Sequence, residues 1–239
     1  MSTYVLVHGA YHGAWCYTKL VPLLKDAGHI VIAVDLPGHG KNPTPIHQVT
    51  LSNYVNHVCQ IIDSQPGPVI LVGHSLGGIT ISQTAEQRSN KIKYLVYLTA
   101  MMPKNGESRM DISARVNEIP KVAQARVSVA GGSASVIGAE SIKPLFYEDC
   151  LEEDIVFAKK NLVPQATQIL YAEVSLSDNS YGNVPRVFIE CLKDQAIPLQ
   201  MQRRMVADMP CDRVLSLNTS HSPFFSAPDE LAFHLLSLS

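Results

Sequence analysis

The chain has 239 residues, of which 46% are hydrophobic and 17% are charged, and its formal net charge is −2. This composition is that of a folded globular protein with a sizeable hydrophobic core, and it excludes an intrinsically disordered chain. Because lysine and arginine are scattered along the sequence and form no cluster longer than two, we expect no binding to nucleic acid and none to a membrane surface.

No apolar run approaches the ~20 residues needed to span a bilayer, and no basic segment precedes the first apolar run, Tyr4 to Val7. We therefore expect an intracellular, cytoplasmic protein. The cysteines are odd in number and widely spaced, which fits neither a disulfide framework nor a Cys-x-x-Cys metal site. We expect reduced thiols at Cys16, Cys59, Cys150, Cys191 and Cys211.

Short apolar runs rich in β-branched residues alternate with segments that have the pattern of helices. The expected strands are Tyr4 to Val7, Ile30 to Val34, Val69 to Val72, Tyr94 to Leu98, Val187 to Ile189 and Val214 to Leu217. The expected helices are Trp15 to Ala27, Leu51 to Ser64, Leu76 to Arg88, Leu199 to Ala207 and Glu230 to Leu238. Because the strand runs are continuously apolar, both faces of the sheet must be covered. The pattern predicts an α/β fold with a mostly parallel central sheet.

The alternation stops at about residues 103–185, a stretch with several prolines, a Gly131-Gly132 turn signal and a helix-like segment, Leu151 to Leu162. An unstructured loop of this length would be unusual inside a compact domain. We predict a single domain over residues 1–239, with a core formed by residues 1–102 and 186–239 and a cap inserted at about residues 103–185.

The strand Val69 to Val72 leads into Gly73-His-Ser75-Leu-Gly77, which matches the Gly-x-Ser-x-Gly pattern of a nucleophile elbow. On this sharp turn from strand to helix, the positions two before and two after the serine come close together, so only very small side chains fit there. The turn exposes the hydroxyl and directs the first N–H groups of the next helix toward it. We predict that Ser75 is a catalytic nucleophile, in preference to a serine in an ordinary glycine-rich turn.

A serine hydroxyl needs a base to become nucleophilic, and the base needs an acid that fixes its tautomer. In the expected chain order of serine, acid and histidine, His221 follows the last strand, Val214 to Leu217. Asp194 follows the strand run Arg186 to Cys191, at the same edge of the sheet. We predict a catalytic triad of Ser75, Asp194 and His221.

Three other carboxylates are weaker candidates for the acid. Glu190 falls inside a strand, Asp208 inside a helix, and Asp212 just before the next strand, where a carboxylate is usually solvated. The other histidines lie before or at the elbow, except His234 in the closing helix.

An oxyanion hole requires one N–H donor after the nucleophile and one from the loop after the first core strand. That loop is His8-Gly-Ala-Tyr-His-Gly13. We predict that the backbone N–H groups of Ala10 and Leu76 stabilise the tetrahedral intermediate.

Two motifs suggest a ligand only superficially. His8 and His12 are four apart, but the adjoining glycines argue against the helix that would make them a metal pair. Asp35-Leu-Pro-Gly-His-Gly40 lacks the Lys-Ser or Lys-Thr ending of a phosphate-binding loop, so we interpret it as a loop near the entrance of the site. We expect no metal and no cofactor.

Several motifs together resemble one branch of a known family. They are the opening His8-Gly-Ala-Tyr-His-Gly-Ala-Trp15, the elbow Gly73-His-Ser-Leu-Gly-Gly78, the segment Tyr181 to Cys191 and the tail from Asp194 to His221. They resemble the plant methylesterase and hydroxynitrile lyase branch of the α/β-hydrolases, and related bacterial carboxylesterases, over essentially the whole chain. The resemblance implies an α/β-hydrolase fold with helices on both faces of the sheet, a cap after its sixth-strand region, and small, largely apolar substrates held under that cap without a cofactor. Related bacterial enzymes accept bulkier xenobiotic esters.

The lyases of this branch differ at two positions, which are Gly9 and Ser222 here and which we expect in the substrate pocket. The lyases carry a threonine at the first and a lysine at the second. Without the lysine no cation stabilises departing cyanide, and without the threonine hydroxyl a cyanohydrin oxygen loses a partner. Both differences favour an esterase.

We therefore predict a carboxylesterase-type serine hydrolase that cleaves small-molecule carboxylic esters through an acyl-enzyme, as a monomer or homodimer. One alternative is a hydroxynitrile lyase or other enzyme that cleaves carbon–carbon bonds with the same triad, which a substrate panel separates. Another is a ligand receptor on a hydrolase fold, because a fold alone does not guarantee catalysis. The sequence leaves the natural ester open.

Overall fold

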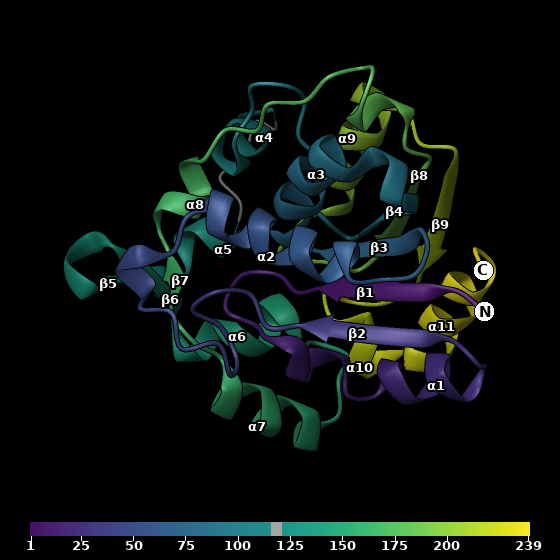
Figure 1. Ribbon diagram of the computed structural model, residues 1–239. Helices are drawn as coiled ribbons and strands as arrows, with labels where there is room; N and C mark the ends of the chain where they lie inside the picture. The colour runs from purple at the N-terminus through teal and green to yellow at the C-terminus, as the bar shows by residue number, and fades with distance from the viewer. Residues whose placement is uncertain (116–120) are drawn as a thin grey trace.

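The computed structural model describes residues 1–115 and 121–239. Within them a six-stranded sheet has the order β2-β1-β3-β4-β8-β9, and every neighbouring pair is parallel (Figure 1). Its strands are β1 (Thr3–Val7), β2 (Ile30–Val34), β3 (Val69–His74), β4 (Ile92–Leu98), β8 (Arg186–Cys191) and β9 (Arg213–Leu217). Each expected strand run lies within one of them, so the predicted fold class is confirmed.

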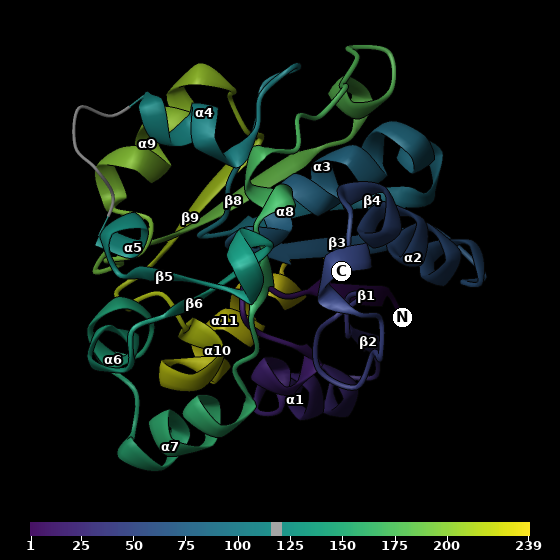
Figure 2. The same ribbon diagram turned by 90° about the vertical axis from the view of Figure 1, so that its left-hand side faces the viewer.

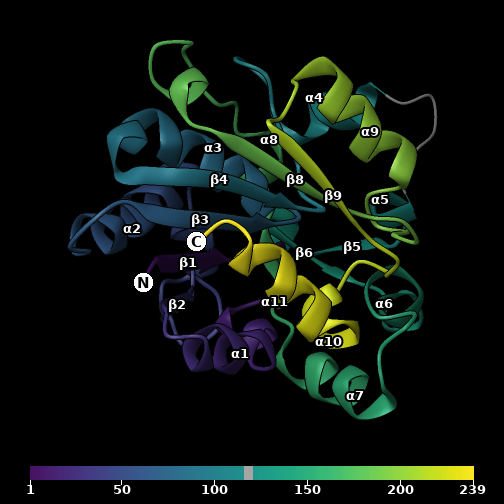
Figure 3. The same ribbon diagram turned by 90° about the vertical axis from the view of Figure 1, so that its right-hand side faces the viewer.

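Helices cover both faces of this sheet (Figure 3). The core helices are α1 (Leu20–Asp26), α2 (Leu51–Asp63), α3 (Gly77–Arg88), α9 (Leu199–Asp208), α10 (Pro223–Ser226) and α11 (Pro228–Leu236). Short 3-10 helices are η1 (Ala14–Tyr17), η2 (Ile46–Gln48) and η3 (Ser89–Lys91). Helices α2, α3 and α9 pack on one face, and α1, α10 and α11 pack on the other.

Strand β1 shows why the strand runs are continuously apolar. Val5 and Val7 belong to the hydrophobic cluster on the α2 and α3 side, whereas Tyr4 and Leu6 belong to the cluster on the α1 and α11 side. All four side chains are fully buried. Successive side chains of a strand point to opposite faces, so a strand covered on both sides has no polar face.

The expected continuous helix from Trp15 to Ala27 is wrong: the segment divides into η1 and α1. Pro22 is the physical reason. It is the third residue of α1, within the first turn, where a helix N–H has no intrahelical acceptor; inside a longer helix it would interrupt the hydrogen-bond ladder. Helix α11 similarly begins at Pro228, two residues before the expected start, because proline is favoured at the first helical position.

The described residues between β4, the fourth strand along the chain, and β8 lie across the carboxyl edge of the main sheet (Figure 2). Their strands β5 (Arg126–Val129), β6 (Ala134–Ile137) and β7 (Gln165–Ala166) form a small antiparallel sheet. Their helices are α4 (Arg109–Ala114), α5 (Lys121–Gln124), η4 (Ala130–Gly132), α6 (Ala139–Phe146), α7 (Glu152–Asn161), α8 (Gln168–Tyr171) and η5 (Tyr181–Asn183). The Gly131-Gly132 turn joins β5 to β6, and α7 coincides with the expected helical segment. No helix in the described residues is both long and apolar enough to cross a bilayer.

Candidate active site

Ser75 lies on a strained turn between β3 and α3. Its φ of 53° is in the left-handed region, which a residue with a side chain adopts at an energetic cost. Its backbone N–H donates to the carbonyl of Leu98 at 3.3 Å, and its carbonyl accepts from Met101 N–H at 2.9 Å and Gly78 N–H at 3.1 Å. These bonds to the neighbouring strand β4 and the loop after it hold the turn in place.

Glycines surround the turn because backbone atoms approach it closely. A Cβ atom on Gly77 would lie 2.7 Å from the carbonyl oxygen of His8, and one on Gly73 would lie 3.0 Å from the carbonyl oxygen of Gly77. A Cβ atom on Gly9 would lie 2.7 Å from the Cβ of Ser75. The steric requirement expected for the two motif glycines therefore extends to the first loop.

Asp194 and His221 are hydrogen bonded to each other at the carboxyl edge of the sheet. Asp194 follows β8 and His221 follows the adjacent parallel strand β9, so both loops emerge at the same edge. The distance from Nδ1 of His221 to Oδ2 of Asp194 is 2.6 Å, and both side chains are buried. An ionised carboxylate only accepts hydrogen bonds, so the proton of His221 sits on Nδ1 and leaves Nε2 as the base.

Three further donors fix the orientation of Asp194. The backbone N–H groups of Ala196 and Ile197 donate to Oδ1 at 2.7 and 2.9 Å. The hydroxyl of Thr99 donates to Oδ2 at 2.5 Å. Sequence reasoning missed Thr99, since a threonine after β4 carries no motif; only the adjacency of β4 and β8 brings it to the carboxylate.

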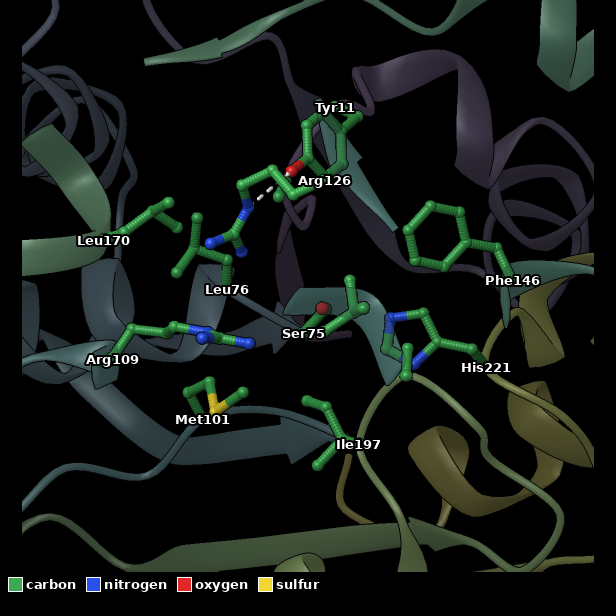
Figure 4. A pocket seen from close by; sticks show the side chains of 13 residues that line it. Tyr11, Ser75, Leu76, Met101, Arg109, Arg126, Phe146, Leu170, Ile197 and His221 are labelled. Carbon is green, nitrogen blue, oxygen red and sulfur yellow. Dashed lines mark hydrogen bonds between the residues drawn. The ribbon is translucent and has the colours of Figure 1, made fainter. Parts of the chain in front are cut away.

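Ser75 and His221 both line one pocket at the carboxyl edge (Figure 4). In the described part of the chain, the Ser75 hydroxyl and Nε2 of His221 have no hydrogen-bond partner, including each other. In enzymes without substrate, such catalytic hydrogen bonds are often long and tighten only when substrate binds. Ser75 is partly exposed, so a small molecule in the pocket reaches its hydroxyl.

Ala10 and Leu76 line the same pocket. Across the described residues, their backbone N–H groups donate to no acceptor, unlike the N–H of Ser75, which donates to the carbonyl of Leu98. Two unused N–H groups beside a serine hydroxyl are the arrangement that stabilises an oxyanion. The assignment of Ala10 and Leu76 as oxyanion donors stays a prediction.

Four histidines lie buried beneath the site and are held neutral. Burial lowers the pKa of His12 to about 3 and that of His39 to about 4, and burial also lowers the pKa values of His8 and His74 well below their usual range. Nδ1 of His8 donates to the carbonyl of Gly9, while its Nε2 accepts from the N–H of Leu36.

His12 uses both ring nitrogens in the same way. Its Nδ1 donates to the carbonyl of Ala10, and its Nε2 accepts from the hydroxyl of Tyr147 at 2.6 Å. The ring nitrogens of both histidines in the first loop are therefore already bonded within the protein. This bonding supports the expectation that the pair binds no metal.

The loop from Asp35 to Gly40 has a structural role in this arrangement. The carboxylate of Asp35 accepts from the N–H of Ala14 at 2.6 Å and from the N–H of Lys41 at 3.0 Å. His39 donates to the carbonyl of His12. The loop thus ties the first loop of the site to β2.

The alternative acids are engaged elsewhere. Glu190 accepts from Arg203 and from the hydroxyl of Ser216. Asp208 pairs with Arg204, and Asp212 accepts from the N–H of Arg186.

The pocket is largely apolar but contains two arginines that the sequence did not single out. Its lining residues are Ala10, Tyr11, Ser75, Leu76, Met101, Arg109, Val122, Arg126, Phe146, Leu170, Ala196, Ile197 and His221. Gly9 lies behind Ser75 and Ser222 is fully buried, so neither is among the residues that line the pocket. Arginine usually lies on the protein surface, so the sequence does not indicate that these two arginines line a pocket.

The fold and this site define a hydrolase, and a family comparison agrees. Residues 4–232 match the model of the alpha/beta hydrolase family. The chain belongs to that family, and the resemblance to its plant esterase and lyase branch is confirmed by the relatives that follow.

Proteins with similar sequences include methylesterases, another esterase and a lyase. Methylesterase 7 of Arabidopsis thaliana is 33% identical, covering 99% of this chain and 95% of its own length. Alpha-hydroxynitrile lyase of A. thaliana is 35% identical, covering 95% of this chain and 93% of its own length. A chloroplastic A. thaliana relative of the methylesterase group is 35% identical, and the chain spans 63% of its length.

The crystal structure of polyneuridine aldehyde esterase superposes with a TM-score of 0.90 at 29% identity, covering 100% of this chain and 99% of that one. The same esterase, from Rauvolfia serpentina, is 31% identical in sequence. These full-length matches support a carboxylesterase-type hydrolase, with the lyase as the weaker alternative.

Proposed function

We propose that the chain hydrolyses small carboxylic esters, with Ser75 as nucleophile, His221 as general base and acid, and Asp194 as the group that orients His221. The Ser75 oxygen attacks the ester carbonyl while Nε2 of His221 takes its proton. His221 then returns the proton to the departing alcohol. Water, activated by the same nitrogen, hydrolyses the acyl-enzyme and releases the acid.

The hydrogen bond of 2.6 Å between His221 and Asp194 carries this proposal, because it orients the imidazole and leaves Nε2 free in the pocket of Ser75. The unused N–H groups of Ala10 and Leu76 supply the two donors for the oxyanion. Each such donor contributes about 10²- to 10³-fold to turnover in serine hydrolases. Residues 103–115 and 121–185, which lie over this edge of the sheet, act as the cap that excludes water.

Two side-chain positions favour ester hydrolysis over cyanohydrin cleavage. Gly9 carries no hydroxyl, and the 2.7 Å approach of a Cβ there to Ser75 opposes any larger residue without a backbone shift. Ser222 follows His221, so no ammonium group lies at that position. The proposed site therefore lacks the ammonium group directly after the catalytic histidine that stabilises departing cyanide in the lyases.

Hydrolysis of a short-chain p-nitrophenyl ester tests the proposal. We expect turnover by the wild type and its loss, by at least about 10³-fold, in Ser75→Ala, with circular dichroism unchanged. Ser128→Ala, an exposed serine on β5, is the matched control and should retain full activity. Unchanged turnover in Ser75→Ala would exclude the proposed nucleophile, and release of cyanide from mandelonitrile without ester turnover would favour the lyase.

The proposal includes a cytoplasmic location and a monomer or homodimer as the working state. One relative is chloroplastic by name, so fractionation of cells that express the natural gene is the appropriate test of location. Sedimentation velocity tests the oligomeric state.

A further inference from the structure

Two arginines line the catalytic pocket beside Ser75 (Figure 4). Arg109 comes from the first turn of α4, and Arg126 comes from β5. Arg109 is only 3% exposed. A guanidinium this deeply buried is normally paired with a carboxylate, because an unpaired buried charge is costly.

Neither arginine has an acidic partner in the residues that the structure describes. Nε of Arg126 donates to the hydroxyl of Tyr11 at 3.3 Å, and Nη1 of Arg109 contacts the sulfur of Met110 at 3.5 Å. The other N–H groups of both guanidiniums donate to no acceptor within this described part. Among the described residues, each guanidinium therefore keeps N–H donors that face the pocket of Ser75 without an acceptor.

The positive charges of Arg109 and Arg126 also repel each other. Burial, and next the charge of Arg126, lower the pKa of Arg109 to about 10, which still leaves it protonated at neutral pH. An anion placed between the guanidiniums would accept hydrogen bonds from both and offset their repulsion. The planar guanidinium matches the geometry of a carboxylate in particular.

We propose that Arg109 and Arg126 form an anion subsite within the catalytic pocket, and that the substrate is an ester bearing a second group that is a free carboxylate. This proposal rests on the proposed esterase function of Ser75. It narrows the substrate from any small ester to an anionic one.

The arrangement around Ser75 also indicates which part of the ester is charged. Figure 4 shows the two guanidiniums on one side of Ser75, and His221 with Phe146 on the other. Because His221 protonates the departing alcohol, the alcohol part lies on the His221 side. The arginines therefore face the acyl part, and the substrate class is a monoester of a dicarboxylic acid with a small alcohol.

Monomethyl glutarate and its uncharged counterpart dimethyl glutarate test this directly. We expect the wild type to favour the monoester in kcat/KM by about tenfold or more. Arg109→Met and Arg126→Met keep much of the apolar stem and should each lower kcat/KM for the monoester by about 10- to 100-fold, with at most a threefold change for the diester. Arg213→Met, at an exposed arginine of β9, should change neither value.

The position of the charge has its own test. Acetoxyacetate carries its carboxylate on the alcohol side and should gain nothing from the arginines relative to its ethyl ester. A preference for acetoxyacetate that Arg109→Met abolishes would contradict the acyl-side assignment.

Binding of glutarate to Ser75→Ala separates failure of this inference from failure of the esterase proposal. We expect thermal stabilisation by glutarate that the added Arg109→Met change removes. If the wild type hydrolyses both glutarate esters equally and glutarate stabilises nothing, the anion subsite is wrong while the esterase stands. If no ester is hydrolysed but stabilisation depends on the arginines, the subsite stands and the esterase fails.

Lysine variants serve if a methionine variant does not fold. Arg109→Lys and Arg126→Lys retain the charge but lose the bidentate guanidinium. We expect them to lower kcat/KM for the monoester selectively, by a smaller factor than the methionine variants.

Discussion

Thr99 donates its hydroxyl to the same carboxylate oxygen of Asp194 that binds His221, at 2.5 Å. Thr99 has a φ of 37°, a conformation that costs energy for a β-branched residue, so the bond is made despite backbone strain. We infer that Thr99 is a positioning residue: it acts on substrate only through Asp194 and His221.

Replacing Thr99 by valine removes this hydroxyl at nearly constant shape. We expect Thr99→Val to lower kcat about tenfold with little change in KM, because the orientation of the base suffers while substrate contacts remain. Thr84→Val is the matched control, since it also loses a buried hydroxyl bond, to the carbonyl of Thr80 within α3. Equal losses of kcat in both variants would indicate a structural effect and not a positioning one.

Asp194→Asn tests the acid. The amide cannot accept from His221 and Thr99 as the carboxylate does, so the imidazole loses its fixed tautomer. We expect kcat to fall by about 10³- to 10⁴-fold with the fold intact. Glu190 lies inside β8 and its carboxylate binds Arg203, so Glu190→Gln should stay within a few fold of wild type. If Glu190→Gln proved the more damaging change, the assignment of the acid would be wrong.

Gly77→Ala tests the steric origin of the elbow. Its Cβ would lie 2.7 Å from the backbone oxygen of His8, which cannot yield without moving the loop from His8 to Gly13 that contains Ala10. We expect the free energy of unfolding to drop by about 2 kcal/mol or more, with loss of ester turnover. Gly67→Ala, where a Cβ meets nothing within 4 Å, should change stability by less than about 1 kcal/mol. Urea denaturation of both variants measures the difference.

The buried histidines predict an acid-sensitive stability. Each is neutral in the folded protein but gains a proton on unfolding below the ordinary histidine pKa of 6.5, so the unfolded state binds more protons and stability falls as pH falls. For His39 the loss runs from pH 6.5 down to its folded pKa of about 4. By pH 5 one such histidine accounts for about 2 kcal/mol.

His39→Asn keeps a side-chain N–H donor for the carbonyl of His12 but does not titrate. The variant should therefore lose about 2 kcal/mol less than the wild type between pH 7.5 and 5, measured by urea denaturation at each pH. The interval from pH 7.5 to 5 lies above the pH range in which most carboxylates titrate. Identical pH slopes for both proteins would contradict the assignment of a neutral, buried His39.

The sequence predicted the strands and the elbow because their signals are local. A single decapeptide predicts the turn, because it contains both the continuous apolar run Val69 to Val72 and the glycines around Ser75. Asp194 and His221 followed from their positions just after strands. The order of the strands in the sheet then brings their loops together, which is why a one-dimensional pattern sufficed.

Features that depend on tertiary packing were not predictable. Thr99 and Arg109 carry no motif, and an arginine is ordinarily a solvated residue. The small sheet β5-β6-β7 pairs Ala134 with Ala166, which are far apart in the sequence, and its strands are too short for a periodic pattern. Arg109 and Arg126 reach the pocket only when the segment after β4 folds over the carboxyl edge of the main sheet.

Covalent labelling with a fluorophosphonate tests the central claim most directly, because an activated serine displaces fluoride from phosphorus and keeps the label. We expect one label per chain, mapped by mass spectrometry to the peptide that contains Ser75, with no label in Ser75→Ala and strongly slowed labelling in Asp194→Asn. Ester turnover that persists in a wild-type protein whose Ser75 stays unlabelled, or labelling at a different residue that abolishes turnover, would contradict the account.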